Sequence, residues 1–94
     1  MTEAREAVQS VTVTAPLGMH ARAAARFVRT ASRFASHVTV ARDGRTMDGK
    51  SIMGLLLLAA ARGACLTITA RGADADDAVA ALSRLVEQNF EADA

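Results

Sequence analysis

The chain has 94 residues, of which 51% are hydrophobic and 22% charged, and its formal net charge is +1. This composition is typical of a globular protein and, at this length, predicts one domain over residues 1–94. The single cysteine excludes an internal disulfide. The longest apolar run is far shorter than the roughly 20 residues of a membrane helix. The charged N-terminus does not resemble a signal peptide. We therefore expect a cytoplasmic protein that does not insert into a membrane.

Three short segments alternate strictly between apolar and polar residues, which predicts strands with one buried side and one side facing water. These segments are residues 11–14, 38–40 and 66–69. A sheet that is wet on one side must carry its helices on the other side.

The first helix is predicted over about residues 20–33, because apolar residues recur at helical spacing from Ala24 to Ala31. Helices usually begin with a Ser, Thr, Asp or Asn cap and carry acidic residues in the first turn. This helix instead has His20 at the cap and Arg22 in the first turn, and it contains no acidic residue. Such a start favours an anion site, because free backbone N–H groups and a guanidinium are both available there.

The middle of the chain contains a hairpin signal, Asp43-Gly44. A strand of about residues 36–42 should therefore turn into a short third strand near residues 45–47. Ser51 is then the expected cap of a short apolar helix that runs from Ile52 to about Ala60.

A fourth strand is expected over residues 64–71, with Cys65 semi-buried at its start. The last helix should start at Asp74, with further acidic residues in its first turn, as the helix dipole prefers. Its predicted core stripe consists of Val79, Leu82, Leu85 and Val86, and Phe90 is expected to pack near its end. The order β-α-β-β-α-β-α predicts an α+β open-faced β-sandwich, in which a four-stranded antiparallel sheet is covered on one face by three helices.

Two motifs carry a family resemblance. The segment Gly18-Met19-His20-Ala21-Arg22, followed by Gly49-Lys50-Ser51-Ile52-Met53-Gly54, resembles HPr, the histidine-containing phosphocarrier family of the bacterial phosphoenolpyruvate:sugar phosphotransferase system. The similarity extends to Gly72-Ala73-Asp74 and covers nearly the whole chain. It implies the fold described above and a stoichiometric phosphoryl carrier rather than an enzyme. In this family enzyme I phosphorylates the active histidine, which passes the phosphoryl group to enzyme IIA domains.

The resemblance also implies roles for individual residues. By position the active histidine is His20, phosphorylated on Nδ1. The guanidinium of Arg22 and the backbone N–H groups of Ala21 and Arg22 would then steady the phosphoryl oxygens. The chain departs from the family at Ala23, where most members have proline. Alanine adds an N–H donor and loosens the entry into the helix.

Ser51 matches the serine that HPr kinase/phosphorylase modifies in many members, and it is also an ordinary helix cap; both roles are compatible. The resemblance further implies a docking surface for enzyme I and enzyme IIA that includes Ile52, Met53 and Leu56, whereas Leu55 and Leu58 are expected in the core. A basic stripe along the first helix, to which Arg26 belongs, favours an acidic partner, although an ordinary solvated face fits the pattern equally well.

Other classes of protein fit the residues less well. An RNA-binding β-α-β-β-α-β domain should display aromatic residues on its sheet, but none of the three phenylalanines lies in a predicted strand. No catalytic set is visible, and His20, His37 and Cys65 lack metal-ligand spacing, so we expect no metal and no cofactor. We also expect a monomer that binds no nucleic acid. Within the family, one alternative stays open: a mainly regulatory phosphotransfer protein of the nitrogen-related branch or of catabolite control.

Overall fold

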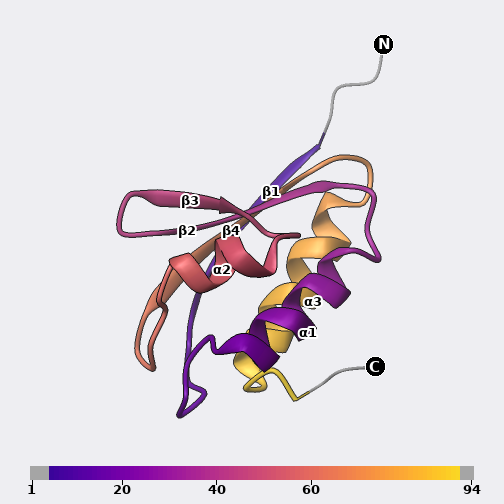
Figure 1. The fold of residues 1–94 in the computed structure, drawn as a ribbon. Helices are drawn as coiled ribbons and strands as arrows, with labels where there is room; N and C mark the ends of the chain where they lie inside the picture. The colour runs from indigo at the N-terminus through magenta and orange to yellow at the C-terminus, as the bar shows by residue number, and fades with distance from the viewer. Residues whose placement is uncertain (1–4, 92–94) are drawn as a thin grey trace.

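The computed structural model describes residues 5–91. Its sheet contains four antiparallel strands in the order β1-β4-β2-β3, so the last strand made is inserted between the first two (Figure 1). In chain order the elements are β1 (Glu6–Thr12), α1 (Ala21–Ala31), β2 (His37–Arg42), β3 (Arg45–Asp48), α2 (Ile52–Leu57), β4 (Cys65–Arg71) and α3 (Ala75–Glu87). This arrangement confirms the expected α+β open-faced sandwich.

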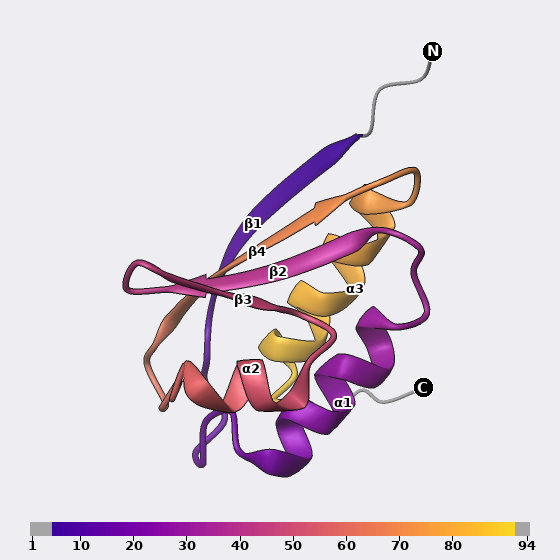
Figure 2. The same ribbon diagram turned by 45° about the horizontal axis from the view of Figure 1, so that its top comes forward.

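The three helices lie on one face of the sheet, and α1 and α3 pack side by side on it (Figure 2). The two helices run antiparallel, so the start of α1 lies near the end of α3. There the Arg26 guanidinium donates to the Phe90 carbonyl over 2.8 Å. At the opposite ends, the Asp74 carboxylate accepts from the backbone N–H groups of Ala35 (2.9 Å) and Ser36 (3.0 Å) and from the Ser36 hydroxyl.

The bonds made by Asp74 have an electrostatic consequence. The Ser36 hydroxyl, and next to it the Ala35 amide, hold the pKa of the Asp74 carboxyl below its ordinary value of 3.8, because they bond the charged form. Partial desolvation opposes this shift. Helix α3 starts at Ala75, one residue later than expected, and Asp74 is its N-cap residue, but the Asp74 side chain makes no capping bond to that helix. It joins the α1–β2 connection to the start of α3 instead.

The core lies between the sheet and the helices. Alternate strand residues, such as Val38, Val40, Leu66 and Ile68, are fully buried and face the helices. The predicted stripe of the last helix is confirmed, since each of its members is at most 4% exposed: Val79, Leu82, Leu85 and Val86. Phe90, just beyond the helix, is buried as well. Burial of each such leucine, valine or phenylalanine contributes about 1.5–3 kcal/mol, which holds the helices on this face.

The first strand is longer than the alternation predicts. It was expected over residues 11–14, but β1 begins at Glu6 and ends at Thr12. The extension pairs with β4 in regular register, from Glu6 opposite Arg71 to Thr12 opposite Cys65. The first half of β1 is largely exposed on both sides, and the alternating pattern is lost there.

The second helix is shorter than expected. It ends at Leu57 rather than near Ala60, because Ala59 adopts a left-handed conformation with φ of 50°. Two arginines of the hairpin bind its last carbonyl groups: Arg42 donates to Leu58 over 2.9 Å and Arg45 to Leu57 over 3.3 Å. These bonds satisfy acceptors that a helix end leaves free.

Cys65 is exposed, so the expectation that it is semi-buried was wrong. It lies at the start of β4, opposite Thr12, and its neighbour Leu66 is the residue that faces the core. The strand period of two residues therefore turns the Cys65 side chain to the open face of the sheet. The hairpin signal is confirmed, since Asp43 and Gly44 both have positive φ (51° and 80°), as a tight hairpin turn requires.

Candidate functional site

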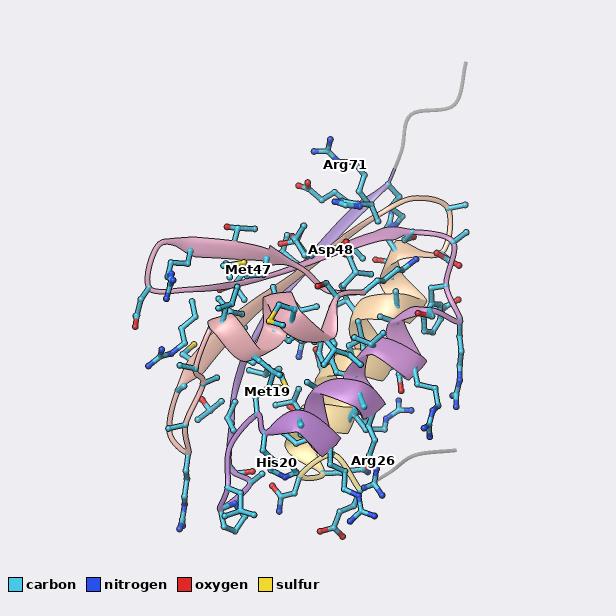
Figure 3. The ribbon with its side chains drawn as sticks, in the orientation of Figure 1. Met19, His20, Arg26, Met47, Asp48 and Arg71 are labelled. Carbon is cyan, nitrogen blue, oxygen red and sulfur yellow. The ribbon has the colours of Figure 1, made fainter. Side chains whose placement is uncertain are left out.

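His20 occupies the N-cap of α1, as the sequence predicts. Its backbone is extended (φ −79°, ψ −179°), and its Nδ1 atom accepts from the backbone N–H groups of Arg22 (3.2 Å) and Ala23 (3.4 Å). A histidine that caps a helix in this way holds its ring over the positive end of the helix dipole. Figure 3 places His20 at the N-terminal end of α1, far from Arg71 at the other end of the molecule.

The two N–H groups that bond Nδ1 are not the same pair as those predicted to bind the phosphoryl group, and the latter contacts stay a prediction. Ala21 and Arg22 were expected to present their N–H groups to the phosphoryl site, whereas the two that face Nδ1 in the structure are those of Arg22 and Ala23. In the first turn of a helix these N–H groups have no carbonyl partner in the preceding turn. The Nδ1 atom takes the place of that partner.

The loop before His20 is fixed by close backbone contact with the segment after α2. Gly18 has a φ of +66°, and a Cβ at this position would lie 2.5 Å from the Ala60 carbonyl oxygen. The N–H of Met19 donates to the same oxygen over 2.8 Å, and the Met19 side chain is buried. Glycine is therefore required at residue 18, for space as well as for backbone conformation. With Met19 pointing inward, His20 is turned toward water.

Two arginines of α1 lie in different environments. Among residues 5–91, the exposed guanidinium of Arg22 makes no hydrogen bond or ion pair. The Arg26 side chain is half-buried, and its guanidinium is bonded to the Phe90 carbonyl. The Thr14 hydroxyl also reaches the end of α3, where it bonds to the Asn89 side chain over 2.7 Å. Arg22 is thus available for an incoming anion, whereas Arg26 holds α1 to the end of α3.

Ser51 caps α2, and its hydroxyl oxygen accepts from the Gly54 N–H over 3.0 Å. The side chain is half-buried. The ammonium group of the preceding Lys50 donates to the Phe34 carbonyl, in the α1–β2 connection, over 2.8 Å. The expected helix-cap role of Ser51 is confirmed by this geometry.

The residues expected on the docking surface are exposed to different degrees. Ile52 is 42% and Met53 66% exposed, while Leu56 is half-buried. Leu55 and Leu58 are buried, as expected. Two further leucines, Leu17 (79%) and Leu57 (51%), are exposed, which the sequence analysis did not predict. Leu57 lies in a run of four leucines, residues 55–58, so its hydrophobicity does not distinguish it from its buried neighbours.

Two other features of the described part of the chain bear on function. No group of histidine, cysteine, aspartate or glutamate side chains in residues 5–91 is arranged to hold a metal ion. The same residues contain no helix that is both long and apolar enough to cross a membrane.

Comparison with known proteins gives the class to which this fold and its N-cap histidine belong, the phosphocarrier proteins. Residues 7–88 match the family model described as "PTS HPr component phosphorylation site". The chain therefore belongs to the HPr family, the phosphocarriers of the phosphotransferase system.

Individual relatives agree with this assignment. The chain is 46% identical over 83 residues to the phosphocarrier protein HPr of Xylella fastidiosa, covering 88% of this chain and 93% of the relative. The crystal structure of HPr from Bacillus anthracis matches with a TM-score of 0.83 and 41% identity, over 86% of this chain and 96% of that one. HPr from Thermoanaerobacter tengcongensis matches with a TM-score of 0.86 and 37% identity, over 89% and 94% of the two chains.

Proposed function

We propose that His20 accepts a phosphoryl group on Nδ1 from phosphorylated enzyme I and passes it to enzyme IIA domains of the sugar phosphotransferase system. The observation that carries this proposal is the position of Nδ1, which accepts from two first-turn N–H groups at the start of α1. A nitrogen that accepts these bonds carries no proton, so its lone pair is the nucleophile of the ring.

Arg22 is the second participant in the proposed reaction. The transferred phosphoryl group spreads negative charge over its oxygens in the transition state. The Arg22 guanidinium lies in the first turn of α1, exposed and unpaired within the described residues, so no existing bond must break before it binds these oxygens. Its charge adds to the positive end of the helix dipole.

The test is transfer of labelled phosphate from phosphoenolpyruvate through purified enzyme I, compared between the wild type and His20→Ala. We expect acid-labile label on the wild type and none on His20→Ala. His37→Ala is the matched control, because it removes the other histidine, which lies exposed on β2. Equal labelling of wild type and His20→Ala would contradict the proposal.

We propose, second, that Ile52, Met53, Leu56 and Arg26 belong to the surface on which enzyme I and enzyme IIA dock. Exposed apolar side chains next to a basic helix provide the contacts that partner proteins use. Met53→Glu should weaken binding to enzyme I about tenfold, since a charge then replaces an apolar contact. Val8→Glu is the control: Val8 is similarly exposed (57%) but lies on β1. Equal affinity of both variants would exclude Met53 from the surface.

We propose, third, that HPr kinase/phosphorylase phosphorylates Ser51 and that this modification regulates the carrier. Gly54 and the start of α2 provide an N–H group and a positive helix end beside the hydroxyl, so a phosphate can be accommodated without unfolding. It would add about −1.5 to −2 charge to the docking surface. An in vitro kinase assay should label the wild type and Ser10→Ala but not Ser51→Ala. Labelling of all three would refute this role.

A further inference from the structure

The backbone N–H of Ala23 faces the same nitrogen as that of Arg22. The distances to Nδ1 of His20 are 3.4 Å from Ala23 and 3.2 Å from Arg22. The two donors differ in their surroundings, because Arg22 is exposed whereas Ala23 is 2% exposed and its bond is partly buried. One N–H is therefore held firmly by the core, and the other lies at the surface.

The bonds to Nδ1 change when that nitrogen reacts. In phosphoryl transfer the lone pair of Nδ1 forms the new bond to phosphorus, while the bond from phosphorus to the donor group of phosphorylated enzyme I breaks and leaves its electron pair on that group. The lone pair of Nδ1 is then used, and the Ala23 N–H has lost its acceptor. The phosphoryl oxygens are attached at the same nitrogen, are negatively charged and lie at the start of the same helix, where N–H groups bind anions.

From this geometry we infer that Ala23 is a positioning residue of the carrier: its N–H orients the unmodified His20 ring and then donates to a phosphoryl oxygen, stabilising the phosphohistidine. This inference rests on the proposed function. A donor fixed in partly buried backbone loses little freedom on binding and competes less with water than an exposed one. The side chain contributes only by packing, since the group that acts is the main-chain N–H.

The direct test needs no variant. The ¹H–¹⁵N resonance of Ala23 is followed by NMR in the full chain before and after phosphorylation by phosphoenolpyruvate and enzyme I. We expect the Ala23 amide proton to move downfield together with that of Arg22, because a charged acceptor replaces a neutral nitrogen. A shift confined to Arg22 would overturn the inference.

A pair of variants measures the size of the effect. Ala23→Pro removes the N–H, and proline is tolerated in the first turn of a helix, whereas Ala23→Gly keeps the N–H and adds no atoms. The readout is the equilibrium phosphorylated fraction of each protein in exchange with phosphorylated enzyme I. We expect Ala23→Pro to lower the equilibrium constant about three- to tenfold, the effect of one hydrogen bond, and Ala23→Gly to stay near the wild type.

The outcomes separate the inference from the proposed function. A wild-type chain that takes no phosphoryl group on His20 overturns both. A phosphorylated wild type, with equal equilibrium constants for Ala23→Pro and Ala23→Gly, overturns only the role of Ala23. Circular dichroism of each variant establishes that it is folded before the comparison is made.

Discussion

Helices α1 and α3 pack against the same sheet and against each other, but their N-terminal ends carry opposite charges. The first turn of α3 contains Asp76 and Asp77, which complement the positive end of its dipole. The first turn of α1 contains no acidic residue and includes Arg22. The start of α3 is thus neutralised by its own residues, whereas the start of α1 is left positive. A positive helix end without a permanent partner is suited to an anion that must come and go.

The largest effect is expected when α1 is given an acidic first turn like that of α3. Ala21→Glu should raise the free energy of unfolding by about 0.3–1 kcal/mol through the helix dipole. It should also slow phosphorylation of His20 about tenfold to a hundredfold, because the carboxylate repels the incoming phosphoryl oxygens. Urea titration and the labelled transfer assay measure the two effects. The control is Ala21→Gln, which has a similar size and no charge. An equally large loss of phosphorylation rate in Ala21→Gln would show that the charge of the glutamate does not cause the slower transfer.

The next effect concerns Asp74, whose carboxylate bonds the α1–β2 connection. Its pKa in the folded protein is held below 3.8 by the Ser36 hydroxyl and the Ala35 amide, so the ionised form stabilises the fold. This contribution is complete above 3.8 and is lost as the pH falls through the lowered pKa. Asp74→Asn should therefore be less stable than the wild type at neutral pH, and the difference should shrink in acid. Urea midpoints across the pH range test this. Equal midpoints at neutral pH would contradict it.

The smallest effect is expected at the start of α3 itself. Asp77 is exposed in the first turn, and Asp77→Asn removes one favourable charge from the helix end. The free energy of unfolding should fall by about 0.3–1 kcal/mol, and the fall should diminish in high salt. Phosphorylation of His20 should be unchanged, because His20 caps the other helix. A change in the transfer rate would show that the two helix ends are not independent.

Most of the fold follows from local patterns. The alternation in residues 38–40 and 66–69, the turn signal at Asp43 and the helical spacing after His20 each correspond to an element of the structure. These patterns arise because burial on one side of a strand or helix constrains which residues occupy it. At positions that are exposed on all sides, burial does not restrict the residue type, and no pattern marks the element. The first half of β1 could not be predicted, since it owes its strand conformation to pairing with β4.

The two main residues of the candidate site, His20 and Arg22, could be predicted from the sequence, whereas the contacts around them could not. An N-cap histidine followed by an arginine is visible in the sequence because both residue types are unusual at a helix start. The contact between Gly18 and Ala60 is not visible in the sequence, since it joins two loops separated by two helices and a hairpin. The exposure of Leu17 and Leu57 likewise depends on how the chain packs. The role of the Ala23 N–H follows from a distance that only coordinates provide.

The position of β4 between β1 and β2 has a consequence for synthesis on the ribosome. Of the four strands described, β4 is made last, yet it lies inside the sheet. It pairs with residues made much earlier, as Arg71 does with Glu6. The sheet of a nascent chain cannot close until Arg71 has left the exit tunnel. Until then β1 has no neighbouring strand, and the edge of β2 that pairs with β4 is unpaired. Contacts between such distant residues slow folding, so the sheet closes only after β4 has been made.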